Sequence, residues 1–175
     1  MRKAVWVVLT GLALAGSRAE AQDVTYDYDK RADFTRLKTY AWGRNTGISD
    51  ELNQQRIVAA VDAQLALKGL KPAQAGTRPD VTVSYQVKFN TTREMSGFAT
   101  GGGPFGWGGI RSGSARINET TEGTLVVNIA AAEGGAVVWR GTASKAVDAK
   151  ADPEKREKNI TKATEKLFRN YPYKA

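Results

Sequence analysis

The chain has 175 residues and a formal net charge of +8, and it contains neither cysteine nor histidine. These two absences exclude disulfide bonds, Ser-His-Asp and Cys-His catalysis, and the common zinc sites. The length suits one ordinary domain after a short leader, and no shift in composition marks a second domain.

The first 21 residues have the features of a secretory signal. Arg2 and Lys3 precede an apolar run over residues 4–15, and a small-x-small cleavage sequence follows at 19–21. The run is shorter than the roughly 20 apolar residues of a membrane-spanning helix. We therefore predict a signal peptide over residues 1–21; an uncleaved N-terminal anchor is the alternative.

The same segment bears on lipid anchoring. Leu14-Ala15-Gly16 resembles the start of a bacterial lipobox, but Ser17 stands where a lipoprotein needs the cysteine that carries the lipid. The sequence predicts cleavage after Ala21 and a free mature domain over residues 22–175. We expect this domain in the periplasm or outside the cell, without a lipid anchor and without a transmembrane span.

The charge of the mature chain bears on its partners. Removal of the leader, with Arg2, Lys3, Arg18 and Glu20, would leave a net charge of +6. In the cytoplasm such a charge would favour nucleic acid, but the export signal argues against it. An envelope protein or an anionic envelope surface fits the compartment better, and a basic surface without a specific partner is the simpler alternative.

Two short strands and a helix are predicted first in the mature chain. Residues 24–29 and 38–42 have strand patterns and flank a turn at 33–37, and residues 49–68 have the periodicity of a helix that Gly69 ends. The helix carries one apolar stripe, formed by Ile57, Val58, Val61 and Leu65.

Three strands and a second helix follow. Residues 79–90 alternate between apolar and polar, and strands 124–131 and 136–147 flank a glycine hairpin at 133–135. Trp139 is predicted to point inward. The last helix begins at Asp152-Pro153, a capping carboxylate followed by a proline at the first helical position. Its predicted buried side chains are Ile160, Ala163, Leu167 and Phe168.

The order strand, strand, helix, three strands, helix predicts an α+β fold. We expect an antiparallel sheet of about five strands with both helices packed on its apolar face. The opposite face would be polar and would include Thr82, Ser84, Gln86 and Lys88. This polar face is one candidate surface for contact with a partner.

A glycine-rich loop over residues 96–113 is the second candidate surface. It lacks the Gly-Lys-Ser/Thr ending of a phosphate loop, and a strand rather than a helix follows it, so the context argues against nucleotide binding. The possible partner-contact residues are Phe98, Phe105, Trp107 and Arg111. The alternative is a loop that binds nothing.

Other candidate chemistry is weak. Asp27, Asp29 and Asp33 could bind a hard cation, but no calcium-loop pattern accompanies them, and a solvated surface is favoured. Ser144 and Lys145 are strand neighbours that point to opposite faces, so they do not form a nucleophile–base pair. We therefore predict no catalytic, cofactor-binding or metal-binding residue, and no cofactor.

Several short motifs follow one another along the chain: Tyr26-Asp27-Tyr28-Asp29, Asp33-Phe34, Leu37 to Trp42, Leu67 to Leu70, Pro79-Asp80-Val81, Gly123-Thr124-Leu125, Val138 to Gly141, and Tyr171-Pro172. In this shared order they resemble a bacterial domain-of-unknown-function family, DUF4136. The resemblance covers about the whole mature chain.

The resemblance implies an exported α+β envelope protein, often a lipoprotein, in which glycine- and aromatic-rich inserts are familiar. It implies no activity and no site residue. The leading interpretation is thus a non-enzymatic interaction or structural domain of the envelope. A small-ligand or lipid-binding module is an alternative, and a glycan hydrolase with a carboxylate pair is a less favoured one.

Overall fold

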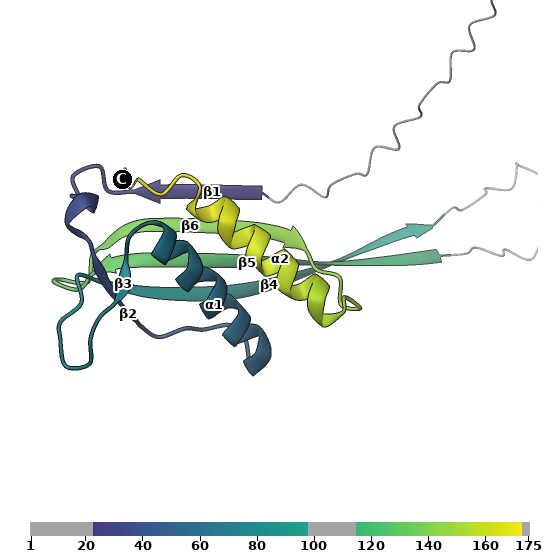
Figure 1. Ribbon diagram of the computed structural model, residues 1–175. Coiled ribbons are helices and arrows are strands. Elements are labelled where there is room, and N and C mark those ends of the chain that lie inside the picture. The colour runs from purple at the N-terminus through teal and green to yellow at the C-terminus, as the bar shows by residue number, and fades with distance from the viewer. Residues whose placement is uncertain (1–22, 98–114, 173–175) are drawn as a thin grey trace, which may run out of the picture.

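The computed structural model describes residues 23–97 and 115–172, which form a six-stranded sheet with two α-helices on one face (Figure 1). In chain order the elements are β1 (Asp23–Tyr28), a 3-10 helix (Phe34–Arg36), β2 (Thr39–Trp42), α1 (Glu51–Leu67), β3 (Lys71–Pro72), β4 (Val81–Gly97), β5 (Ala115–Ala131), β6 (Val137–Ala146) and α2 (Pro153–Phe168).

The sheet is mixed, which corrects the expected antiparallel sheet of about five strands. Its strand order is β1-β6-β5-β4-β2-β3. Strands β1, β6, β5 and β4 pair antiparallel with their neighbours in this order, whereas β2 pairs parallel with both β4 and β3. Helix α1 lies between β2 and β4 in the chain and returns the backbone to the same end of the sheet, which makes these two neighbours parallel.

Local sequence signals explain where the turns and helices begin. Gly134 and Gly135 both have positive φ in the β5–β6 hairpin, as the sequence predicts. The Asp50 side chain accepts hydrogen bonds from the backbone N–H groups of Leu52 and Asn53 at the start of α1. Asp152 accepts one from the N–H of Lys155 at the start of α2, so both helices have the predicted type of N-terminal cap.

The core lies between the helices and the apolar face of the sheet. Trp139 is fully buried and points inward, as expected; it stacks on Phe168 of α2 with ring centroids 4.9 Å apart. The other fully buried large apolar side chains come from α1, the turn after it, α2 and the central strands: Val61, Leu65, Leu70, Val81, Val83, Val127, Ile129 and Leu167. The predicted stripes are thus confirmed, with Val58, Ile160 and Ala163 only partly buried.

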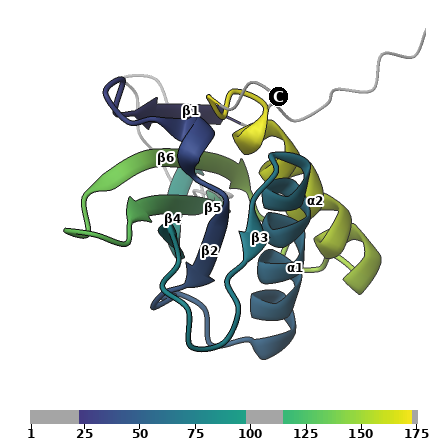
Figure 2. The same cartoon turned by 60° about the vertical axis from the view of Figure 1, so that its left-hand side comes forward.

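The opposite face of the sheet is open. In the turned view no helix or strand among the described residues covers it (Figure 2). Strands β4 and β5 are also longer than predicted: they pair from Val81↔Ala131 to Gly97↔Ala115 and project as a hairpin beyond the helices (Figure 1). No helix in the described ranges is long and apolar enough to cross a membrane.

Candidate functional site

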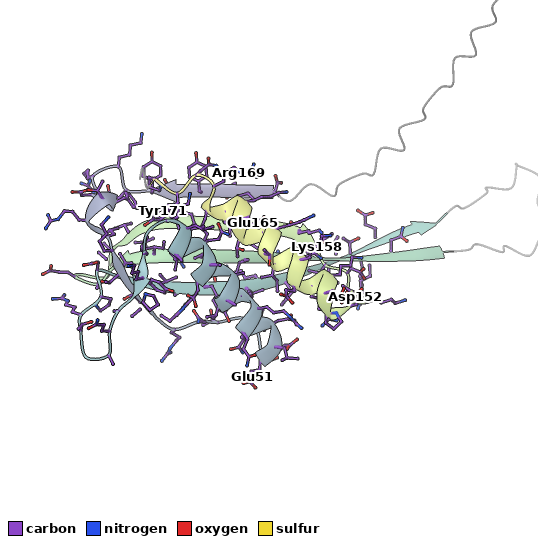
Figure 3. The ribbon with its side chains drawn as sticks, viewed as in Figure 1. Glu51, Asp152, Lys158, Glu165, Arg169 and Tyr171 are labelled. Carbon is purple, nitrogen blue, oxygen red and sulfur yellow. The ribbon has the colours of Figure 1, made fainter. Side chains whose placement is uncertain are left out.

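The apolar face of the sheet extends beyond the helices that cover the rest of it. The two helices run in the same direction and begin at the end from which the β4–β5 hairpin projects, as Glu51 and Asp152 mark in Figure 3. Beyond these starts, Phe89 of β4 is 53% exposed and Val147, which follows β6, is 41% exposed. This end of the apolar face is therefore exposed to solvent.

A pocket of about 340 Å³ occupies this place. Its walls come from β4, β5, β6, both helices and the segments that lead into them, and they are mainly aliphatic. The apolar lining includes Ile48, Ile57, Val87, Phe89, Leu125, Ala143, Val147, Ile160 and Ala163. A concave apolar site of this size falls within the range that small-molecule sites occupy, about 300–1,000 Å³.

A glycine shapes one wall of the pocket. Gly123 is paired directly with Phe89 across the strands. A Cβ atom on Gly123 would lie 2.7 Å from Cγ2 of Val147 and 3.4 Å from Cε1 of Phe89. Because the position has no side chain, Phe89 and Val147 approach the strand backbone closely from two sides and form a continuous apolar wall.

Two positively charged side chains, Lys145 and Arg156, also line the pocket. The Lys145 ammonium donates to Oδ1 of Asn159 on α2 at 3.0 Å. Arg156 lies one helical turn before Asn159; its Nε donates to the carbonyl of Ala151 at 2.9 Å and its Nη2 to that of Ala149 at 3.3 Å. Residues three apart on a helix share a face, so both positive groups lie along the same side of α2.

One carboxylate, Asp148, lines the pocket. It accepts from the Lys155 ammonium at 2.8 Å and from the backbone N–H of Lys150 at 3.0 Å. The hydrogen bond from Lys155 and that from Lys150 hold the pKa of Asp148 below its usual value. The group is therefore an ionised structural carboxylate and is unsuited to act as a general acid.

The predicted contact residues of the glycine-rich loop, Phe98, Phe105, Trp107 and Arg111, lie outside the described residues, as do the predicted signal peptide and Ser17. The polar face of the sheet, the other predicted surface, is present. Thr82, Ser84, Gln86 and Lys88 share the open face of the sheet with their cross-strand partners Ala130, Asn128, Val126 and Thr124.

The three N-terminal carboxylates do not converge. Asp27 accepts from the N–H of Tyr28, Asp29 binds Arg31, and Asp33 accepts from Thr35. Within the described ranges, no group of three or more acidic side chains is placed to hold a metal ion.

Ser144 and Lys145 point to opposite faces, as predicted. Ser144 Oγ lies 2.9 Å from Thr124 Oγ1 on the open face, while Lys145 reaches α2 on the other.

The pocket and the role of its polar residues were not predicted from the sequence. Arg156, Asn159 and Lys145 are far apart or in no shared binding motif, and Lys145 was considered only as a neighbour of Ser144. The apolar alternation does continue to Phe89, but that pattern is typical of a buried residue and gave no sign that the end of the sheet is uncovered.

Comparisons with known proteins agree with this architecture. The PDZ domain protein from Parabacteroides distasonis has a TM-score of 0.54 and 16% identity over 89% of this chain, which spans 37% of that protein's length. The PelC dodecamer from Paraburkholderia phytofirmans has a TM-score of 0.51 and 11% identity, covering 84% of this chain and 94% of that one. These likenesses concern the fold alone.

A third similar structure is a DUF4136 family protein from Bacteroides thetaiotaomicron, with a TM-score of 0.51 and 16% identity. The match covers 87% of this chain and 96% of the Bacteroides chain. A search of curated protein sequences gave no significant match. The family model for a domain of unknown function, DUF4136, matches residues 24–173, and the chain therefore belongs to the DUF4136 family.

Proposed function

We propose that this chain is a non-enzymatic binding module of the bacterial cell envelope, and that the pocket at the start of the two helices takes the hydrocarbon chain of a small ligand. The observation that carries the proposal is the aliphatic pocket itself. It is open at the exposed Phe89 and Val147 and is continuous with the core at Ile57 and Leu125.

The energetics favour a hydrocarbon chain as the occupant. Each methylene group transferred from water into an apolar site contributes about 0.8 kcal/mol, and association itself costs several kcal/mol. A medium-length chain that fills the pocket should accordingly bind with a Kd between about 1 mM and 1 µM. A polar solute would gain little, because the side chains that line the interior offer it few partners.

The pocket lining, as formed by the described residues, brings no two carboxylates together, which supports a binding role over a catalytic one. A glycan hydrolase needs two carboxylates that face each other across the substrate. Asp148 is the one acidic residue in the lining, and Lys155 already pairs with it. Envelope location is part of the proposal and rests on the signal-like residues 1–21 and the cleavage sequence that ends at Ala21.

Displacement of a fluorescent apolar probe tests the binding site. N-phenylnaphthylamine should gain fluorescence on binding the purified chain, and decanol should displace it. Replacement of Ala163 by phenylalanine would fill the pocket from α2 and should weaken both ligands at least tenfold. Ala59→Phe is the matched control, because Ala59 lies on the exposed side of α1 outside the lining.

A second variant covers the case in which Ala163→Phe does not fold. Phe89→Ser removes an exposed apolar wall without overpacking and should also weaken probe binding. Equal probe affinity in the wild type, in Ala163→Phe and in Phe89→Ser would contradict the proposed site. Cell fractionation with mass measurement of the mature chain tests the compartment: a mass that begins at Gln22 is expected, and a lipidated form would contradict the proposal.

A further inference from the structure

The pocket combines uncharged aliphatic walls with positively charged side chains, and this combination indicates one class of ligand. We propose that the pocket selects a fatty acid, with Arg156 and Lys145 holding the carboxylate while the chain lies against the apolar walls. This inference rests on the proposed function, since it assigns the polar end of the same ligand.

Arg156 carries the argument. Its guanidinium has five N–H donors in a planar fork; Nε donates to the carbonyl of Ala151 and Nη2 to that of Ala149. Within residues 23–97 and 115–172, no carboxylate lies within 4 Å of this guanidinium. The two carbonyl bonds fix the side chain, which is half-buried, while its positive charge has no protein anion beside it.

Further positively charged side chains lie near Arg156. Lys145 is held by Asn159, one turn along α2 from Arg156. Asn53, at the start of α1, also lines the pocket and accepts from Nη1 of a further cation, Arg56, at 2.9 Å. Since Lys155 neutralises Asp148, the lining has an excess of positive charge over negative.

This charge distribution matches a single-chain carboxylate. An arginine fork binds the two oxygens of a carboxylate with charge-assisted hydrogen bonds, which are stronger than neutral ones. The aliphatic walls begin directly beside the cations, at Ile160 and Ala163 on the same helix. A neutral alcohol would gain only the hydrocarbon contacts, and a cationic amphiphile would be repelled.

Three amphiphiles with the same chain separate these cases. Decanoate, decanol and decyltrimethylammonium are titrated into the purified chain at low salt, with displacement of N-phenylnaphthylamine as the readout. Decanoate should bind about tenfold more tightly than decanol, as one charge-assisted hydrogen-bonded contact implies. Decyltrimethylammonium should bind most weakly.

Variants assign the preference to the cations. Arg156→Gln should weaken decanoate about tenfold and change decanol less than about twofold. Lys158→Gln is the control, because it removes an equal charge from the outer side of α2 and should change neither (Figure 3). Lys145→Gln serves as the second variant if Arg156→Gln does not fold, and it should also reduce the preference for decanoate over decanol.

Equal affinities for decanoate and decanol, or no loss of preference in either pocket variant, would overturn the fatty-acid assignment while leaving an apolar pocket in place. Failure of all three amphiphiles to bind would instead contradict the proposed function on which the assignment rests.

Discussion

The indole ring of Trp139 lies over Gly141, two residues further along β6. A Cβ atom on Gly141 would be 2.5 Å from Cη2 of Trp139 and 2.5 Å from Cδ2 of Leu167. Trp139 can therefore lie flat between β6 and α2, where it stacks on Phe168, only because position 141 has no side chain. This close approach anchors α2 on the sheet.

Gly141→Ala should lower the free energy of unfolding by about 2 kcal/mol, the usual cost of overpacking a core. Urea denaturation at neutral pH measures it. The Trp139→Phe replacement makes room for the added methyl group, so the double variant should lose less than the two single changes combined. If the losses in unfolding free energy of the two single variants add up in the double variant, the indole ring and the methyl group at position 141 do not clash.

Asp80 connects the starts of β2 and β4. Its Oδ2 accepts from the backbone N–H groups of Lys38 and Thr39 and from the Thr39 hydroxyl, at 2.8–2.9 Å. These hydrogen bonds lower the pKa of Asp80, and the bond from the Lys38 N–H has the largest effect. A lowered pKa in the folded state stabilises the protein above the unfolded value, and this stabilisation is lost as the pH falls through the folded value.

Asp80→Asn should therefore lose about 1 kcal/mol of unfolding free energy at pH 7, a modest loss because the site is exposed to solvent. The difference in unfolding free energy between the variant and the wild type should become smaller as the pH is lowered below about 4. Urea titrations at several pH values measure this difference. A difference that stays constant with pH would contradict the role of the ionised carboxylate.

Tyr171 places a hydroxyl in the aromatic cluster around Trp139 and Phe34. The hydroxyl is buried and has no hydrogen-bond partner among the described residues. Burial raises the pKa of Tyr171 to about 12. Because the folded value lies above the unfolded value of about 10, the stabilisation is complete below pH 10 and is lost as the pH rises toward 12.

We expect Tyr171→Phe to be neutral or more stable by about 1 kcal/mol at pH 7, since it removes an unpaired buried hydroxyl. Between pH 10 and 12 its unfolding free energy should fall less steeply than that of the wild type, by up to about 1.4 kcal/mol per pH unit. Tyr26→Phe, at an exposed tyrosine of β1, is the control. Equal alkaline slopes in Tyr171→Phe and the wild type would refute the account.

Asp62 of α1 joins the helix to β2. One of its oxygens, Oδ1, accepts from the Tyr40 hydroxyl at 2.7 Å and from Nε1 of Trp42 at 2.9 Å. Asp62→Ala would leave the hydroxyl of buried Tyr40 without this partner and should cost about 2 kcal/mol. Thermal unfolding measures the loss. In a Tyr40→Phe background the same replacement should cost clearly less; an unchanged cost would argue against the bond.

The spacing of apolar residues predicted most of the helices and strands, because each side chain that faces the core must be apolar. The alternation from Val81 to Phe89 gave the facing of β4 correctly, and Asp152-Pro153 located the start of α2. The parallel pairing of β2 with β4 was missed, because strand direction depends on the path of α1 between them and leaves no mark in either strand's pattern.

The pocket could not be predicted from the sequence for a related reason. Phe89 has the pattern of a buried residue, yet it is 53% exposed. Whether such a residue is covered depends on where α1 and α2 start above the sheet, a relation between three segments far apart in the chain. Arg156 gave no signal either, because its partners are backbone carbonyls, which every sequence contains.

The pairing of β1 with β6 governs the order in which the sheet can be completed. Tyr26 pairs with Gly141 and Tyr28 with Trp139, so the first strand of the described chain waits for the last one to be synthesised. Such distant pairings raise the contact order and slow folding. Until β6 is available, β1 has no neighbour in the sheet. A chain stopped before residue 137 therefore leaves β1 unpaired, cannot pack Val24 against the core, and would be open to aggregation.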